Sequence, residues 1–334
     1  MPSGNKEINI KYMQTDKKAY SFMGDEAELK WFFENIVEKP ESHESYLMCI
    51  SSRSKKIPEE DRKKLALARG EMMREQIITT RGKEQVWDFE WFKSFVYRYE
   101  FPYEGMVTKT GYPYPKESLV MYFYVNPSDE HKVMIDNMTH TNSILNDLVN
   151  ACTKMSKDGI REQLYKLRTI DTHKKTCRAT NVSRHLWTQF DMDFSEDTKK
   201  YEERQLIIYE TIRDVGLHFF GKGKFVIVRT SGGFHVLVHR EGMKYWGSYI
   251  RKENGYKYEN AYVKYTNPVQ SFLEAVDARL ALRNNKKSYW YDEWKDTNQS
   301  FLPLPGTLQY GNFVVRVLNK EDFVGTTPIN IEYY

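Results

Sequence analysis

The second half of the chain alternates short apolar runs with amphipathic stretches, and this alternation predicts its elements. Residues 186–194 and 225–229 are rich in β-branched and aromatic side chains, so we expect two strands. Between them, apolar residues recur at helical spacing over 201–215, and Gly216 is expected to end this helix. The pattern predicts a strand–helix–strand unit, in which the helix crosses one face of a sheet.

Further elements follow from the same two periodicities. The Gly-containing turn 230–233 leads to an expected strand over 234–239, a helix is expected to begin at Pro268, and residues 288–294 read as another strand. In the first half the patterns predict a helix from Pro58 into the mid-seventies, a strand over 118–128 and a helix over 137–155. The fold class expected is α+β, with a mixed sheet and helices on one face.

Composition narrows the class of protein. The chain has 334 residues and a formal net charge of +4, enough length for two domains or one elaborate domain. No apolar run approaches the roughly 18 to 20 residues that span a bilayer, and the polar start lacks a secretion signal. Cys49, Cys152 and Cys177 are scattered and odd in number, which favours a reducing compartment. We expect a soluble, unsecreted, intracellular protein with no membrane partner.

One stretch of the chain is strongly basic. Seven basic residues between 161 and 184 face only Glu162 and Asp171. The stretch is either a surface that follows phosphates or an ordinary solvated face. Its basic residues are Arg161, Lys166, Arg168, Lys174, Lys175, Arg178 and Arg184, of which the last four are the predicted nucleic-acid contacts.

Residues 188–194, TQFDMDF, set two aspartates one residue apart. Strand periodicity turns Phe190, Met192 and Phe194 into the core and leaves Asp191 and Asp193 together on the other face. When two carboxylates lie this near to each other, they repel unless a cation lies between them. A divalent metal that prefers hard oxygen ligands, Mg²⁺ or Mn²⁺, would remove this repulsion between the carboxylates. The alternative is an ordinary polar face at the rim of a sheet.

Two further segments carry candidate chemistry. In residues 226–240, Gly232 and Gly233 permit a tight turn whose N–H groups, with Ser231, could meet phosphate before His235 emerges. In residues 288–312, Asp292 lies in an aromatic strand and is a candidate third carboxylate. The alternatives without a catalytic role are an ordinary hairpin turn, a histidine at the sheet rim with its hydrogen bonds satisfied, and an ordinary Pro/Gly loop at 302–307, LPLPGT.

Taken in order, FDMDF, SGGFHVLV and YD followed by LPLPGTLQYG resemble the three motifs of the archaeo-eukaryotic primase superfamily. The resemblance covers the C-terminal half. It implies an N-terminal α/β module packed on a C-terminal module similar to an RNA-recognition fold. Residues 111–334 would form the primase-polymerase core, and residues 1–110 an N-terminal extension with part of the α/β module.

The resemblance also implies an activity. Asp191, Asp193 and Asp292 would be the catalytic, metal-binding carboxylates of a two-metal nucleotidyl transfer, with Mg²⁺ or Mn²⁺ as cofactor. His235 would contact the triphosphate, assisted by Ser231, Arg229 and the turn at Gly232 and Gly233. The reaction would be template-directed DNA priming or polymerisation, with single-stranded DNA and nucleoside or deoxynucleoside triphosphates as partners. A helicase or other replication protein would act in trans, in prokaryotic, plasmid or viral replication.

The chain departs from the family pattern in several places. The usual Arg before the Pro-Gly-Ser/Thr turn is replaced by Pro303, so triphosphate contacts are expected from Arg229, Arg283 or Arg316. Asp277 is an alternative third carboxylate, although it lies in an expected helix. No structural zinc is expected, because four ligands are hard to assemble around the cluster His173, Cys177 and His185.

Two other functions fit part of the pattern. A glycosyltransferase acting on nucleotide-sugars would also use Asp191 and Asp193 to hold a metal on a diphosphate, without needing the Asp292 segment. A non-catalytic protein that binds single-stranded nucleic acid would instead stack bases on a sheet of aromatic side chains. The sequence does not separate priming from primer extension.

Overall fold

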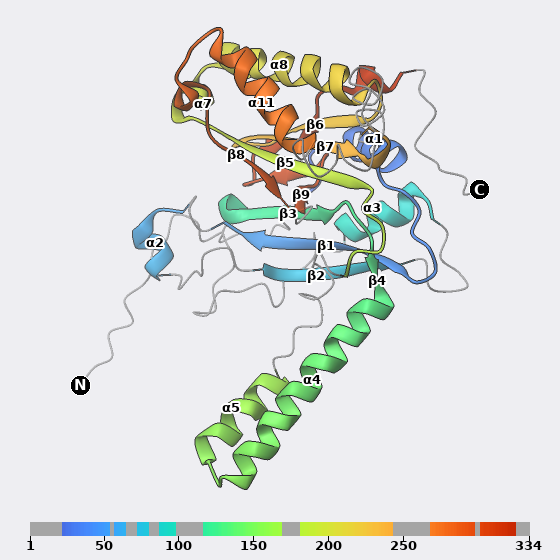
Figure 1. Ribbon diagram of the computed structural model, residues 1–334, viewed down its shortest axis with the longest axis vertical. Helices are drawn as coiled ribbons and strands as arrows, with labels where there is room; N and C mark the ends of the chain where they lie inside the picture. The colour runs from blue at the N-terminus through green and yellow to red at the C-terminus, as the bar shows by residue number, and fades with distance from the viewer. Residues whose placement is uncertain are drawn as a thin grey trace, which may run out of the picture.

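Two antiparallel sheets, one above the other, form the body of the molecule in the computed structural model (Figure 1). The fold is α+β, with helices α8 (Glu202–Phe220) and α11 (Pro268–Ala281) covering the outer face of the upper sheet. The structure describes residues 22–53, 57–64, 72–79, 87–97, 116–168, 181–242, 268–297 and 301–324. Within these residues, no helix is both long enough and apolar enough to cross a membrane.

The upper sheet contains the predicted strand–helix–strand unit. Its strands lie in the order β12-β6-β7-β5-β8, and every neighbouring pair is antiparallel. The elements are β5 (Trp187–Phe194), α8 (Glu202–Phe220), β6 (Phe225–Arg229), β7 (Gly233–His239), α11 (Pro268–Ala281), β8 (Tyr291–Thr297) and β12 (Arg316–Val317). Without β12, this is the β-α-β-β-α-β arrangement of ferredoxin-like folds.

The expectation of a mixed upper sheet was wrong, for a reason visible in the strand order. Strands β5 and β6 run in the same direction, but β7 lies between them and is antiparallel to both. The expected strand over 288–294 is also displaced. Residues Lys287–Trp290 form the short helix α12, and β8 begins only at Tyr291.

Helix α8 continues past the glycine that was expected to end it. Gly216 is buried within the helix, where an added Cβ would lie 2.6 Å from the ring of Phe225 on β6. The residue therefore permits close helix–strand packing. The helix ends at Gly221, whose φ of 84° lies in the left-handed region that favours glycine.

The lower sheet gathers strands from both ends of the chain. Its order is β2-β1-β3-β9, with β4 paired to β1. The strands are β1 (Glu44–Ser52), β2 (Met72–Thr79), β3 (Leu119–Tyr124), β4 (Ser128–Asp129) and β9 (Phe301–Pro303). The sheet therefore crosses the predicted boundary between residues 110 and 111.

Within the described residues, the helix expected from Pro58 into the mid-seventies is confirmed over Glu59–Lys64 and wrong from Met72 onward. Helix α2 covers Glu59–Lys64, and Met72–Thr79 is instead strand β2. Pairing with β1 supplies backbone hydrogen bonds and neighbours that a local pattern does not contain. The strand expected over 118–128 is confirmed in β3.

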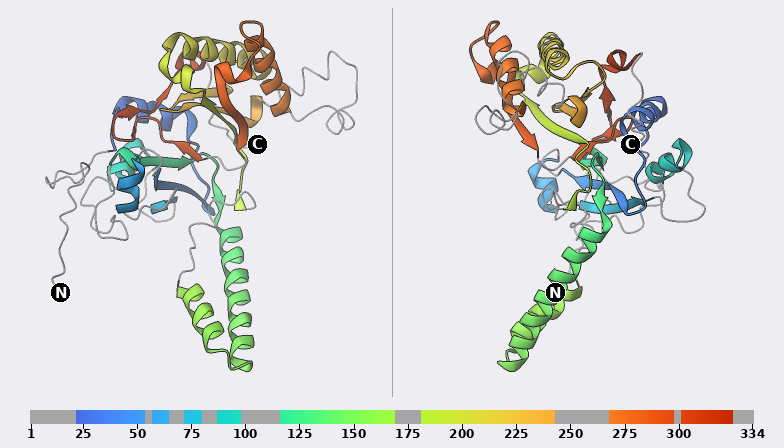
Figure 2. Two further views of the ribbon diagram at one scale, coloured as in Figure 1. Left: turned by 90° about the vertical axis from the view of Figure 1, so that its left-hand side faces the viewer. Right: turned by 45° about the vertical axis from the view of Figure 1, so that its right-hand side comes forward.

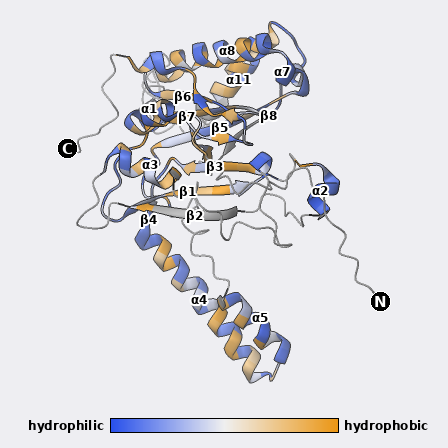
Figure 3. Cartoon of the chain, turned by 180° about the vertical axis from the view of Figure 1, so that it is seen from behind, coloured by the Kyte–Doolittle hydropathy of each residue, from blue (hydrophilic) through white to orange (hydrophobic). Residues whose placement is uncertain are grey.

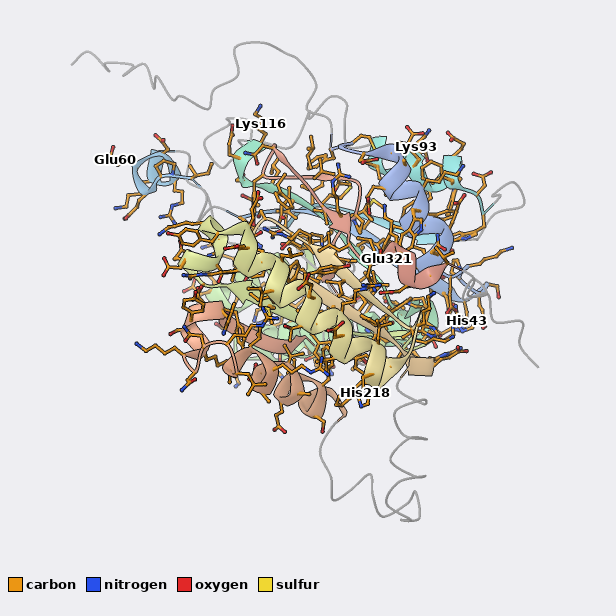
Figure 4. All side chains as sticks on the ribbon, turned by 90° about the horizontal axis from the view of Figure 1, so that it is seen from above. His43, Glu60, Lys93, Lys116, His218 and Glu321 are labelled. Carbon is orange, nitrogen blue, oxygen red and sulfur yellow. The ribbon has the colours of Figure 1, made fainter. Side chains whose placement is uncertain are left out.

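Two helices pack on the lower sheet from the N-terminal half. Helix α1 (Glu26–Ile36) and helix α3 (Phe89–Tyr97) place aromatic side chains against Phe123 of β3. Lys93 of α3, labelled in Figure 4, forms an ion pair of 2.8 Å with Glu26 of α1. These contacts belong to one apolar cluster that also includes residues of β6 and β7, so the two sheets share a core.

A pair of helices projects from the body as an arm (Figures 1 and 2). Helix α4 (Glu130–Thr153) begins directly after β4, with the Asp129 carboxylate accepting from the N–H groups of His131 and Lys132. It starts earlier than the helix expected over 137–155. Helix α5 (Lys157–Arg168) returns along it. The predicted basic stretch begins on α5.

The remaining described elements are short. They are α7 (Glu196–Lys200), β10 (Leu308–Gln309), β11 (Phe313–Val314) and the 3₁₀ turns Lys116–Ser118 and Lys320–Phe323.

Candidate functional site

Strand β5 carries the two aspartates on one face, as its alternation predicted. Phe190, Met192 and Phe194 are buried in the apolar cluster beneath α8 and α11. Asp191 and Asp193 lie on the opposite face, toward the lower sheet, where Asp191 is half-buried and Asp193 is exposed. The strand thus separates an apolar face that anchors it from a carboxylate face.

His235 lies directly opposite Asp191, on the neighbouring strand β7. Its Nε2 is 3.4 Å from Asp191 Oδ1, and its Nδ1 is 2.7 Å from Gln189 Nε2. An amide N–H only donates, so Nδ1 accepts and the neutral ring carries its proton on Nε2, facing Asp191. Burial lowers the pKa of His235, although Asp191 and Asp193 act in the opposite direction. The lowered pKa favours the neutral form of the ring.

The turn between β6 and β7 lies against Asp193. An added Cβ on Gly233 would be 1.7 Å from the Met192 carbonyl oxygen, so this position requires glycine because the two strands approach closely. A Cβ on Gly232 would meet Asp193 Oδ1 at an ordinary 3.6 Å. Gly232 and Gly233 were expected to permit a tight turn, and Gly233 also provides the space that the close approach of β5 requires.

Ser231 completes this turn. Its N–H donates to Gln309 Oε1 at 2.8 Å, so this amide, expected to meet phosphate, already has a partner within the protein. Its Oγ is buried and has no hydrogen-bond partner among the described residues. A buried hydroxyl without a partner is costly, and a ligand or water at this position would satisfy it.

The lower sheet contributes residues that the sequence did not single out. Arg53, just after β1, donates from Nε to the Tyr122 hydroxyl of β3 at 3.1 Å. Burial raises the pKa of Tyr122; Arg53 opposes the rise, and the charge of Asp191 adds to it. Burial also raises the pKa of Tyr310, with a smaller contribution from Asp193. Arg53 and Tyr122 therefore interact electrostatically with Asp191, and Tyr310 interacts with Asp193.

The structure distinguishes the two candidates for a third carboxylate. Asp292 is exposed and lies at a bulge in β8, between the residues that pair with Asp193 and Phe194 of β5. Asp277 lies on α11, on the helical side of the sheet, and accepts a hydrogen bond from the buried Tyr291. Asp277 is therefore on the wrong side to join Asp191.

Metal-binding potential rests on the two aspartates of β5. Within the described residues, no group of three or more His, Cys, Asp or Glu side chains is close enough to hold a metal ion. Two carboxylates on one strand face, completed by water and phosphate oxygens, are a donor set that suits Mg²⁺ or Mn²⁺. Asp191 and Asp193 fit such an ion in chemistry.

Arg229 does not lie where a triphosphate contact requires. Its guanidinium is on the helical side of the upper sheet, over the ring of Phe194 at 4.8 Å. It donates to Gln205 Oε1 of α8 at 2.8 Å and to the carbonyls of Thr230 and Gly233. Burial lowers its pKa to about 10. The prediction for Arg229 is corrected: this side chain stabilises the turn between β6 and β7 from the helical side of the sheet.

The other arginines proposed for phosphate also lie away from the carboxylate face. Arg283 follows the end of α11 on the helical side. Arg316 of β12 pairs with Asp25, at the start of α1, at 3.1 Å. Arg53, by contrast, interacts electrostatically with Asp191, whose charge contributes to raising the pKa of the Arg53 guanidinium.

Arg184 holds the two halves of the body together. Its guanidinium bonds both carboxylate oxygens of Glu44, at 2.7 and 2.6 Å, and Glu38 Oε2 at 3.0 Å. These buried ion pairs occupy its donors, so the prediction that Arg184 contacts nucleic acid is corrected. The other predicted contacts, Lys174, Lys175 and Arg178, lie outside the described residues, as do His173 and Cys177 of the candidate zinc cluster.

The LPLPGT loop packs against helix α1. Gly306 has a φ of 85°, and its carbonyl accepts hydrogen bonds from the N–H groups of Gly24 and Asp25 at 2.9 Å. A Cβ there would lie 2.6 Å from Leu29 N. The loop therefore positions Gln309, which reaches the turn at Ser231.

Comparisons with known proteins add no relative to this picture. A scan against models of protein families and searches of curated proteins and solved structures found no match to this chain. The site is consequently described by its own geometry.

Sequence reasoning missed two kinds of residue in this site. Gln189 was detectable, since residues 189, 191 and 193 are polar at alternate positions of one strand. Arg53 and Tyr122 were not detectable, because they reach the site through a different sheet. Their approach depends on how the two sheets pack.

Proposed function

We propose that this chain is a template-directed nucleotidyltransferase of the primase-polymerase type, acting as a DNA primase, a polymerase or both. The observation that carries the proposal is the approach of His235 Nε2 to Asp191 Oδ1, at 3.4 Å across two adjacent strands, with Asp193 on the same face. The order β6-β7-β5-β8 supports the resemblance to an RNA-recognition fold in the C-terminal module.

Each residue of the carboxylate face has a role in this proposal. Asp191 and Asp193 would hold Mg²⁺ or Mn²⁺, with Asp292 as a further carboxylate at the bulge. When bound, the ions neutralise phosphate charge and favour attack by a 3′-hydroxyl with release of pyrophosphate. His235 donates a hydrogen bond from its Nε2–H to a triphosphate oxygen. Gln189, which donates to Nδ1, keeps the ring in the tautomer with the proton on Nε2.

Ser231 and Arg53 complete the proposed nucleotide site. The buried Ser231 Oγ offers a hydrogen bond to a phosphate oxygen, which supplies the partner it lacks within the described protein. Arg53 brings positive charge from the lower sheet. Such fixed donors favour phosphoryl transfer because the reaction depends mainly on positioning and charge neutralisation.

The test is a nucleotidyl-transfer assay on a denaturing gel. Purified protein is given single-stranded DNA, labelled nucleoside or deoxynucleoside triphosphates and Mg²⁺ or Mn²⁺, with and without an annealed primer. We expect metal-dependent products that disappear in the Asp191→Asn/Asp193→Asn variant. The matched control is Glu196→Gln/Asp197→Asn, which removes two exposed carboxylates from the adjacent helix α7.

The products distinguish the forms of the activity. Short labelled products without primer identify a primase, and extension only with primer identifies a polymerase. Absence of product under all conditions, with DNA binding equal in both variants, contradicts the proposal and favours a non-catalytic binding protein. Metal-dependent cleavage of nucleotide-sugars, lost in the aspartate variant, would identify a glycosyltransferase instead.

A further inference from the structure

The arm formed by α4 and α5 carries an apolar surface that its own two helices do not cover. Among the described residues, most of the large apolar side chains with high exposure lie on this arm. Figure 3 shows apolar positions along α4, far from the body. They are Met134, Ile135, Met138, Leu145, Val149, Met155, Leu164 and Tyr165. Apolar patches of this kind mark interaction sites.

The contact between the two helices uses a different side of α4. Ile144 is buried there, and Ala151 lies near Gly159 of α5, where a Cβ would be 3.2 Å from the Ala151 Cβ. These positions are one heptad apart on α4. At about 100° per residue, they lie well away from the line through Ile135, Leu145 and Val149. The second apolar line is therefore additional to the α4–α5 contact.

This second line has the spacing of a coiled-coil seam. Its positions alternate by three and four residues over the length of α4, and each is exposed. The exposed fractions of Ile135, Met138 and Val149 are 60%, 57% and 63%. We call this set the α4 seam: Ile135, Met138, Asn142, Leu145, Val149 and Cys152. A helix exposed to water on this side gains no stability from so regular a row of mostly apolar side chains.

The chemistry of the α4 seam indicates what covers it. Asn142 occupies the same kind of position as Ile135 and Val149, where in parallel two-stranded coiled coils an asparagine pairs with its counterpart and fixes the register. The flanking positions are all uncharged: Met134, Thr139, Thr141, Asn146, Leu148 and Thr153. A symmetric partner therefore meets no like-charge repulsion, whereas a nucleic acid would find no cations there.

We propose that two copies of this chain pair in parallel through the α4 seam. Each apolar position packs against its counterpart, and Asn142 faces Asn142 of the second copy. The seam is short for a coiled coil, but α4 is already ordered by its cap at Asp129 and by packing on α5. Pre-ordering reduces the entropy lost on association. The pairing is independent of the proposed nucleotidyl transfer.

The first test measures the molar mass of the full chain by sedimentation equilibrium over a range of concentrations. We expect a monomer–dimer equilibrium that Leu145→Glu/Val149→Glu weakens on the order of 100-fold, because apolar contact is lost and like charges are opposed. The matched control, Ser143→Glu/Asn150→Glu, adds the same charge at exposed α4 positions outside the seam and should leave the dimer intact. Circular dichroism establishes that both variants fold.

The second test determines the orientation through Cys152. In a Cys177→Ser background, a short bismaleimide should join Cys152 to Cys152, and Cys152→Ser should abolish the product. A protein that stays monomeric at every concentration overturns the proposal. So does a dimer insensitive to the seam variant, or the absence of the Cys152 product from a proven dimer. A parent protein that is monomeric, and whose seam variant loses single-stranded DNA binding, would assign the seam to nucleic acid instead.

Discussion

At the residue scale, the tightest steric constraint near the site is at Gly233, where β5 and β7 leave no room for a side chain. We predict that Gly233→Ala lowers the free energy of unfolding by more than about 3 kcal/mol, because its Cβ cannot fit beside the Met192 carbonyl without separating β5 from β7. The measurement is urea unfolding followed by circular dichroism. Gly232→Ala is the matched control, since its Cβ meets only an ordinary contact. Equal stability of the two variants would contradict the close approach.

Also at the residue scale, Glu44 links stability to pH. Burial alone would raise the pKa of Glu44, but hydrogen bonds from Arg184 and the Glu41 N–H, with the arginine charge, lower it overall below 4.5. A carboxyl with a lowered pKa stabilises the fold above its unfolded pKa, and this contribution is lost as pH falls through the folded value.

We predict that Glu44→Gln is less stable than the parent by about 2 kcal/mol at neutral pH, because one partner of a buried ion pair is removed. The gap should narrow as pH falls below about 4.5. Urea unfolding from about pH 7 to about pH 3 measures both effects. Glu34→Gln, at an exposed position of α1, is the control; a gap that stays constant in acid would show that Glu44 does not titrate in this way.

At the element scale, Gly216 lies inside helix α8 and allows the helix to pack closely against β6. Alanine at position 216 would favour the isolated helix by about 1 kcal/mol. Its Cβ would also overlap the Phe225 ring, at a cost of about 1–3 kcal/mol. We predict a net loss for Gly216→Ala, measured by thermal unfolding. Adding Phe225→Leu should recover part of the loss; a more stable single variant would disprove the packing role.

At the scale of the whole molecule, the site requires both sheets. Arg53 belongs to the lower sheet, whereas Asp191, Asp193 and His235 belong to the upper one. In the proposed activity, we predict that Arg53→Gln lowers kcat/KM for the nucleotide about 10- to 100-fold with little effect on unfolding. Lys63→Gln, at an exposed position of α2, is the control. Unchanged kinetics for Arg53→Gln would remove it from the site.

Local patterns in the sequence were sufficient for the carboxylate face itself. Apolar alternation in TQFDMDF put Asp191 and Asp193 on one side of a strand, and the short turn before His235 predicted the hairpin of β6 and β7. These features depend on residues within about ten positions of one another, where periodicity and turn chemistry act. Gln189 was readable by the same rule.

Packing between distant segments decided the rest. Residues 72–79 became a strand because β1 was there to pair with them, and Arg229 turned away from Asp191 because its register on β6 faces α8. Asp277 likewise lies away from Asp191 because α11, which carries it, packs on the helical side of the upper sheet. Strand order and sheet–helix packing join residues from tens to hundreds of positions apart, and no local periodicity encodes such contacts.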